Sequence, residues 1–374
     1  MTGLIKETLT EQADGVTEPS LDLDAVMRTG DRRIRRHKVA TVLTVAAASV
    51  AVLAGGITVV KVTGDEPVQP AGQPMNFTER RPTYAANGTI HFGSETIGVG
   101  KDQISAFAQT DAGFVYVTSD GTVKATNGRR TEQIGTGNST RRLAVDDRGP
   151  LVGWVDSTRP TPEFVLYDVA ARREVTRTSE GNRPGTPAPN DDPVQVSAID
   201  DGTAYFGAND GLRRWNVAEG KGQLIKPGAK PTLLHAVSAG QLVWERDQGD
   251  KPSDLASGTD INTSRPRTYQ GWTVNVSPGG RFMMTDIADE VRLYFLESGR
   301  QLPLKFDGYM LIGPTQWQGD GTFYAVGFKD GTTPVDLLTC STSALTCDLT
   351  KAAIAPSPTD KVEFQVPVGF PIDE

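Results

Sequence analysis

Histidine and cysteine are scarce in this chain, which has three of the first and two of the second among its 374 residues. The histidines are His37, His91 and His235, and none has the spacing to another histidine or to a cysteine that metal sites use. A Ser-His-Asp triad would have to draw on the same three residues, and no Gly-x-Ser-x-Gly, Walker or His-Glu-x-x-His motif occurs. We therefore predict no catalytic residue, no metal site and no cofactor, and leave open whether the protein is an enzyme.

Positive charge is also in short supply, because Lys and Arg number 38 against 46 for Asp and Glu, a formal net charge of -8. Binding to nucleic acid needs a concentrated basic face, so this balance predicts no nucleic-acid partner. The 40 glycines and 24 prolines indicate many turns, as in a fold built from short strands.

Only one long apolar run occurs, over residues 39–60, and it contains no charged side chain. As a helix it would measure about 33 Å, against a hydrocarbon core of about 30 Å, so it predicts a single transmembrane helix in the lipid bilayer. Its N-terminal flank is basic, with Arg28, Arg32, Arg33, Arg35, Arg36 and Lys38. By the positive-inside rule, residues 1–38 form a cytoplasmic tail and the C-terminal part lies outside the plasma membrane.

A cleaved signal peptide is the rival interpretation of this run, because Val52-Leu53-Ala54 before Gly55 resembles a signal-peptidase site. The segment that precedes the run is long, and the run exceeds the roughly 7–15 residues of a signal-peptide core. We therefore expect an uncleaved anchor. The basic tail can serve as an orientation signal alone or as a cytoplasmic docking segment. Residues 61–82 follow as a linker with Pro67, Pro70, Pro74 and Pro82.

Residues 83–374 show short apolar alternations separated by Gly, Asp, Asn and Pro, which predict an all-β ectodomain. Six of these alternations each follow a glycine turn. The glycines are Gly113, Gly149, Gly202, Gly240, Gly280 and Gly321. They recur about every 40 residues once the proline-rich insertion 180–193 is set aside, and four strands in such a repeat are typical of a β-propeller blade.

The strand expected third in each repeat carries an aromatic residue near its end. Tyr167-Asp168 and Trp215-Asn216 stand where WD repeats have Trp-Asp, and Tyr294-Phe295 lies at the same point of a later repeat. In these features the chain resembles WD-repeat-like β-propellers, specifically the ectodomains of single-pass membrane proteins of high-GC Gram-positive bacteria. The resemblance covers the ectodomain and implies a bacterial, membrane-anchored propeller.

The blade count follows from the ends of the ectodomain. Six units are complete between residues 104 and 350, and residues 84–100 supply only two more strands, over 89–93 and 95–99. The alternating segment 362–366 could complete that blade, which would close the ring without an exposed sheet edge. We therefore favour seven blades and leave six open.

Two features of the ectodomain carry specific expectations. Cys340 and Cys347 flank a short turn between two predicted strands, which favours a hairpin disulfide outside the cell; two buried free thiols are the alternative. Trp317 comes just before the turn at Gly321, and we expect it to be an exposed ligand contact. Of Trp154, Trp244 and Trp272, most lie inside predicted strands, and these are interpreted as packing residues between blades.

The remaining candidates have structural explanations. His235 falls in a strand expected to line the ring and is interpreted as an inner-strand residue. The acidic pairs Asp146-Asp147, Asp191-Asp192 and Asp200-Asp201 lie in or before turns, where Asp accepts local backbone hydrogen bonds, so they are interpreted as turn residues rather than as a calcium site.

The leading functional hypothesis is a binding or scaffold module for a protein, peptide or glycan outside the cell, because a ring is a rigid support for variable loops. One alternative is an extracytoplasmic lyase or hydrolase. A funnel lined by Arg, Asp and His would favour this enzyme, whereas a flat aromatic rim would favour the binding module. Another is a signalling receptor or regulator that acts through residues 1–38.

Overall fold

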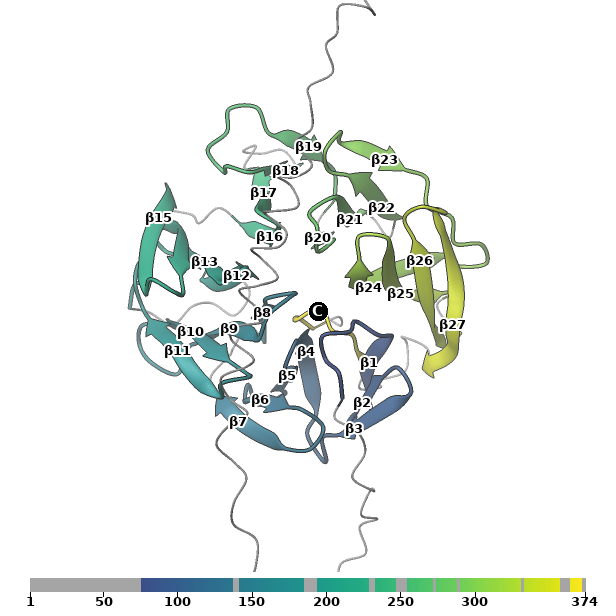
Figure 1. Ribbon diagram of the computed structural model, residues 1–374, viewed down its shortest axis with the longest axis horizontal. Helices are drawn as coiled ribbons and strands as arrows, with labels where there is room; N and C mark the ends of the chain where they lie inside the picture. Colours follow the sequence, from purple (N-terminus) through teal and green to yellow (C-terminus); the bar gives the residue numbers. More distant parts are fainter. Residues whose placement is uncertain are drawn as a thin grey trace, which may run out of the picture. The chain divides into compact units, whose positions relative to one another are not determined.

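The computed structural model describes residues 75–136, 141–184, 194–228, 233–246, 254–271, 274–287, 290–330, 333–356 and 364–371. These residues form seven antiparallel sheets of four strands each, arranged around a common centre (Figure 1). We number the sheets as blades in chain order. The predicted all-β propeller is thus confirmed, with seven blades. The predicted tail 1–38 and transmembrane helix 39–60 lie outside the described residues, and the described part contains no helix able to span a membrane.

The strands follow one another blade by blade. Blade 1 holds β1 (Thr83–Ala86), β2 (Thr89–Phe92), β3 (Glu95–Gly98) and β28 (Phe364–Gln365); blade 2 holds β4 (Ile104–Thr110), β5 (Gly113–Thr118), β6 (Val123–Thr126) and β7 (Thr131–Gly135); blade 3 holds β8 (Ala144–Val145), β9 (Leu151–Asp156), β10 (Glu163–Asp168) and β11 (Arg173–Thr178). Blade 4 holds β12 (Gln195–Asp200), β13 (Thr203–Ala208), β14 (Gly211–Asn216) and β15 (Lys221–Pro227); blade 5 holds β16 (Leu234–Ser238), β17 (Gln241–Arg246), β18 (Asp254–Gly258) and β19 (Arg267–Tyr269). Blade 6 holds β20 (Val274–Val276), β21 (Phe282–Ile287), β22 (Glu290–Phe295) and β23 (Arg300–Leu302); blade 7 holds β24 (Leu311–Gly319), β25 (Thr322–Phe328), β26 (Val335–Ser341) and β27 (Thr346–Ala355).

Both ends of the propeller contribute to blade 1, as the sequence predicts. The C-terminal strand β28 pairs with β1 through Ala85 opposite Gln365 and Ala86 opposite Phe364. The prediction of only two N-terminal strands is wrong, because β1 is a third. All four residues of β1 are buried, so the strand lacks the alternation by which half-buried strands are recognised.

The repeat glycines lie at the turns between the first and second strands of blades 2 to 7. Gly113, Gly202, Gly240 and Gly280 have positive φ, a conformation that other residues adopt only with strain. This requirement gives the repeat its visible period. The strands predicted third in their repeats are β10, β14 and β22, each of which pairs with the second strand of its blade.

The hydrophobic core consists of the layers between neighbouring blades. Phe164 of blade 3 stacks on Phe206 of blade 4, with ring centroids 4.5 Å apart. Trp154 and Trp244 are 1% and 3% exposed, so their interpretation as packing residues is confirmed. Large side chains of the second and third strands therefore join the blades to one another and leave the first strands to line the centre.

The packed structure begins earlier than the linker prediction implies. Phe77, inside the predicted linker 61–82, is 6% exposed and stacks on Phe92 with ring centroids 5.5 Å apart. Its ring also meets the edge of Phe114 in blade 2. Arg80 is 8% exposed. Residues 75–82 thus belong to the propeller, because one large aromatic side chain in the layer between blades 1 and 2 holds them there.

The predicted disulfide is present. Cys340 on β26 is directly opposite Cys347 on β27, with Cα atoms 4.0 Å apart, and the two sulfurs are bonded. Cys340 is fully buried beside Trp317 and Phe323, so the bridge fastens the outer strand of blade 7 to its core.

Candidate functional site

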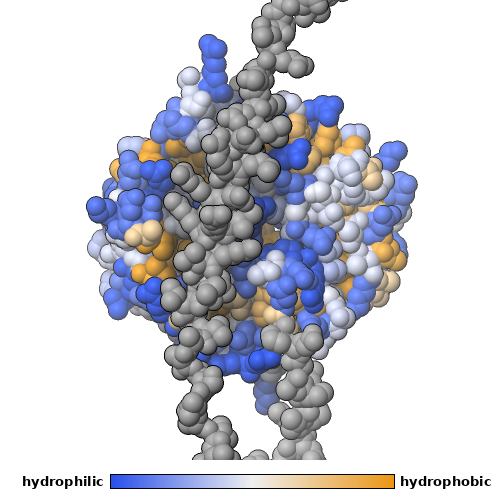
Figure 2. Space-filling view, viewed as in Figure 1, coloured by the Kyte–Doolittle hydropathy of each residue, from blue (hydrophilic) through white to orange (hydrophobic). Residues whose placement is uncertain are grey.

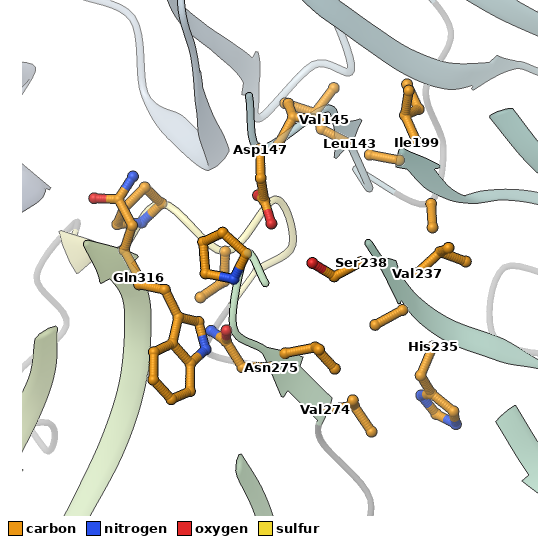
Figure 3. A pocket seen from close by; sticks show the side chains of 18 of the residues that line it. Leu143, Val145, Asp147, Ile199, His235, Val237, Ser238, Val274, Asn275 and Gln316 are labelled. Carbon is orange, nitrogen blue, oxygen red and sulfur yellow. The ribbon is translucent and has the colours of Figure 1, made fainter. Parts of the chain in front are cut away.

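The innermost strands enclose a pocket of about 380 Å³ at the centre of the ring (Figure 3). Its wall comes from β8, β12, β16, β20 and β24, and the C-terminal tail and Arg80 complete it. Binding pockets for small ligands occupy about 300–1,000 Å³ and combine an apolar wall with a few polar groups. The central pocket has that size and that mixture.

The outer surface has fewer features of a binding site than the central pocket. Figure 2 shows hydrophilic side chains over most of the visible face, with scattered hydrophobic patches. Among the described residues, the large hydrophobic side chains that are clearly exposed are Met310 and Leu349, and neither is aromatic. The described part of the chain therefore has no flat aromatic rim, and the central pocket is the stronger candidate site.

Three inner strands carry a β-bulge at the same level of the ring. The extra residues are Ser197 on β12, His235 on β16 and Thr315 on β24. In each case the extra residue lies opposite the bond between the third and fourth residues of the second strand of its blade. All three residues line the pocket. Because a bulge redirects a side chain that regular pairing would place elsewhere, these three polar residues reach the pocket through a shared distortion.

Asp147 is an acidic residue of the pocket with a raised pKa. It lies in the turn between β8 and β9, and Figure 3 shows its carboxylate and the hydroxyl of Ser238 directed into the same space. Burial among protein atoms raises the pKa of Asp147 to about 6, helped by Asp146 and Asp200 and opposed by Arg80 and Arg148. Its side chain still reaches water in the pocket.

The Asp147 carboxylate has no hydrogen-bond or ion-pair partner among the described residues. Arg80 lies close by, but its Nη2 donates to the main-chain oxygen of Asp147 and, at 2.9 Å, to the carboxylate of Asp111. Its Nη1 donates to the main-chain oxygen of Phe77 at 2.7 Å. Arg80 therefore holds the turn of blade 3 and leaves the Asp147 carboxylate for another donor.

Two glutamines form a second polar group of the pocket. Gln109 is 2% exposed, and its Nε2 donates to the carbonyl oxygens of Phe77 and Glu79, both at 2.9 Å. These bonds fix its amide orientation, so its Oε1 accepts from Nε2 of Gln316 at 2.9 Å. Gln316 Oε1 then remains buried without a donor. The two amides thus form a hydrogen-bonded pair within the wall of the pocket.

Arg142 and His235, which also line the pocket, are engaged by the protein. Arg142 donates from Nη1 to Gln195 at 2.9 Å and lies over the ring of Phe370, and burial lowers its pKa. His235 places Nε2 3.7 Å from the carboxylate of Glu245 on the adjacent strand. These contacts tie both side chains to the pocket wall.

The C-terminal tail forms one side of the pocket. Gly369 donates to the carbonyl oxygen of Phe107 at 2.9 Å and accepts from the amide of Leu143 at 2.6 Å, so the tail bridges blades 2 and 3. Gly369 has φ +81°, and a Cβ there would lie 2.4 Å from the oxygen of Leu143. Only glycine fits this crossing. Pro367, Val368 and Phe370 consequently line the pocket.

The residues singled out from the sequence have different outcomes. His235 lies on an inner strand, as predicted. The expected exposure of Trp317 is wrong: it is 5% exposed, because a second bulge on β24 turns it into the layer against Phe323 and Phe282. It also borders the pocket, and its role as a ligand contact stays a prediction. Asp147 is a turn residue as expected, but its position in the pocket was missed.

The pocket brings together the Arg, Asp and His side chains that would favour an enzyme. However, within the described ranges no hydrogen bond links His235 to a hydroxyl group or to Asp147, so no nucleophile and base are paired. The described residues also include no group of His, Cys, Asp and Glu able to hold a metal ion. Among the described residues, the pocket contains one carboxylate without a partner, that of Asp147.

No model of a known protein family matches the sequence, and no protein of curated function matches it. Among solved structures, the computationally designed protein Ika8 is 16% identical, with a TM-score of 0.45 over 73% of this chain and 83% of that one. A prolyl endopeptidase is 12% identical, with a TM-score of 0.49 over 78% of this chain and 51% of that one. The propeller domain of the trilobed protease from Pyrococcus furiosus is 12% identical, with a TM-score of 0.46 over 68% and 86%. These likenesses carry no functional argument.

Proposed function

We propose that the protein is a membrane-anchored binding module, whose propeller faces outward from the plasma membrane and binds part of a protein, peptide or glycan in its central pocket. The propeller fold suits a binding or scaffold role, because its blades form a rigid frame around one site. The apolar run 39–60 and its basic flank support the anchor and the orientation.

One observation carries the binding role: the central pocket contains polar groups that the protein leaves unsatisfied. Asp147 lacks a partner for its carboxylate, and Oε1 of Gln316 and Oγ of Ser197 are buried without hydrogen bonds. Asp147 is the exposed residue among these, so a ligand in the pocket can supply the donor that its carboxylate lacks.

The test uses the full-length protein in intact cells. Crosslinking followed by identification of co-purifying molecules would nominate a ligand, whose binding is then compared in two variants. Ala236→Phe fills the pocket, and Ala352→Phe makes the same change on the exposed outer strand β27. Loss of binding only in Ala236→Phe, with both variants melting cooperatively, supports the proposal. Equal binding by both variants contradicts it.

A hydrolase or lyase is the second candidate, and the raised pKa of Asp147 favours it, because a general acid or base works best when its pKa is near the ambient pH. In that case Asp147→Asn would abolish turnover of a bound ligand without abolishing binding. An unchanged ligand recovered after long incubation with the wild-type protein would remove this candidate.

A further inference from the structure

The pocket presents hydrogen-bond acceptors at the level of the turns between first and second strands. The Asp147 carboxylate is the charged one, and it has no partner among the residues whose structure is described. Oε1 of Gln316 is a neutral acceptor that is buried within the pocket wall, beside the hydrogen bond from Gln316 to Gln109. Nδ2 of Asn275 is already used, because it donates to the carbonyl oxygen of Thr315 at 3.4 Å. A ligand that meets the Asp147 carboxylate must therefore supply a donor.

Apolar side chains surround the acceptors. Val145, Ile199, Val237 and Val274 line the same pocket as Asp147, and they come from four consecutive blades (Figure 3). This wall suits a ligand with an aliphatic stem and excludes a strongly hydrated ion that brings its own water shell. The volume of about 380 Å³ is far larger than a single metal ion needs.

We propose that the central pocket binds a primary alkylammonium group, either a lysine side chain of a peptide or a small free amine, with Asp147 as the carboxylate that receives it. This inference rests on the proposed function, since it names the ligand class of the same pocket. The ammonium head donates to Asp147 and the alkyl stem lies against the valines.

The charged groups around Asp147 favour a cationic ligand head over an anionic one. Arg148 and Asp146 lie in its own turn, Asp200 comes from blade 4, and Arg80 comes from the segment before β1. The guanidinium of Arg80 is already occupied by Asp111 and by two carbonyl oxygens. An anionic ligand head at this position would meet Asp147, whereas a neutral head would leave the carboxylate without a counter-charge.

The test compares three small molecules that differ only in the head group, n-butylamine, n-butanol and butyrate, with full-length protein by ligand-observed NMR. The amine should bind at least about tenfold more tightly than the other two, because a hydrogen bond between charged groups is the strongest available in the pocket. Asp147→Asn should remove that preference. Asp307→Asn, which removes the same charge from an exposed loop, should keep it.

Two further measurements identify the source of the amine and the group whose protonation controls its binding. A short peptide with one lysine is compared with the same peptide carrying norleucine. Tighter binding of the lysine peptide than of butylamine indicates a peptide ligand, and the reverse indicates a free amine; both outcomes support the amine class. Amine binding should weaken as the pH falls through about 6, when Asp147 gains a proton. His235 also lines the pocket, so the pH effect has to be assigned to one of the two residues. Asp147→Asn assigns the effect, because its binding should not change over that range.

The outcomes separate the inference from the function on which it rests. If the three small molecules bind equally and Asp147→Asn changes nothing, the amine inference is wrong and the pocket remains a binding site. If butyrate binds best, the inference is also wrong, and Arg142 becomes the residue to test. If none of the three molecules and neither peptide binds, the amine inference is overturned, and the central pocket as the ligand site is then decided by Ala236→Phe against Ala352→Phe.

Discussion

Gln316 and Gln109 are 207 residues apart in the chain, and a 2.9 Å hydrogen bond joins their side-chain amides at the centre of the ring. Gln316 lies on the inner strand of blade 7 and Gln109 on that of blade 2, so the bond passes beside blade 1, where the ring closes. Gln109 also holds the carbonyl oxygens of Phe77 and Glu79. One buried amide thus joins both neighbours of the closing blade and the segment that leads into it.

Replacing Gln109 by leucine should destabilise the propeller by about 2 kcal/mol. The substitution keeps the size of the side chain but leaves the carbonyl oxygen of Glu79 and the amide of Gln316 unpaired in a buried place. Denaturant unfolding of Gln109→Leu measures the loss. Gln301→Leu, on an exposed strand position, should change the free energy by less than about 0.5 kcal/mol. Equal stability of the two variants would show that the network does not support the ring.

Phe77 should be needed for full stability although it precedes the first strand. Phe77→Ala removes a ring that is 6% exposed and packs on Phe92 and Phe114, so the expected loss is about 3 kcal/mol. Thermal unfolding provides the measurement, with Met310→Ala, at a side chain that is 66% exposed, as the matched apolar truncation. A melting temperature of Phe77→Ala equal to that of Met310→Ala would return residues 75–82 to the linker.

Deleting residues 360–374 should open the ring. The deletion removes β28 and the buried side chains Phe364 and Val366, each of which contributes about 1.5–3 kcal/mol. It also exposes the edge of β1, so aggregation is expected together with a lower melting temperature. The control is deletion of residues 372–374, which leaves β28 and the tail through Pro371. An unchanged melting temperature after the larger deletion would mean that β28 does not seal the ring.

Topology in the membrane is a separate prediction. If residues 39–60 are an uncleaved anchor, protease added to intact spheroplasts should digest residues 65–374 and spare residues 1–38, because the basic flank retains the N-terminus in the cytoplasm. Epitope tags at the two ends follow each part, and lysed spheroplasts serve as the control in which both tags are lost. Recovery of a mature protein that begins near Gly55 would replace the anchor by a cleaved signal peptide.

Asp147 should make stability depend on pH in a direction opposite to that of a salt-bridged carboxylate. Its pKa of about 6 in the folded state lies above the ordinary value, so the folded protein binds the proton more tightly than the unfolded chain does. The ionised form opposes folding, and stability falls as the pH rises through the range from about 4 to about 6. Asp147→Asn should therefore exceed the wild type by about 1 kcal/mol at pH 7.5, a figure reduced for the water that reaches the side chain, and match it at pH 4. Denaturant unfolding at the two pH values measures the difference in free energy of unfolding between the variant and the wild type. The same difference at both pH values would contradict the assignment of the pH effect to Asp147.

The sequence predicts the ring better than it predicts the pocket. Turn glycines recur once in each of blades 2 to 7, and four of them, such as Gly202, have a positive φ that few other residues tolerate. The ring closure followed from the incomplete first repeat. By contrast, β1 was missed because all of its side chains are buried, and alternation cannot reveal such a strand. Periodicity finds elements where one face differs from the other.

The pocket depends on features with no sequence period. The bulges at Ser197, His235 and Thr315 each insert one residue, and nothing in the local sequence separates a bulged strand from a regular one. Trp317 shows the consequence, since a bulge next to it turns a side chain expected at the surface into the core. Asp147 reads as an ordinary turn residue. The turn that holds Asp147 faces the pocket only because the ring is closed, and closure needs contacts between distant parts of the chain.

The shared first blade also bears on how the protein reaches its native state. Strand β1 is made early, yet its inner partner β28 lies near the end of the chain, so the blade that starts the ring is the last to be finished. Until then β1 has a free edge, and the tail that bridges Phe107 and Leu143 is missing from the pocket. Pairing between such distant segments is slow, because a long loop must close before any contact compensates. A chain truncated during synthesis would thus keep an open ring and an unformed site, and ligand binding would report that translation had reached the C-terminus.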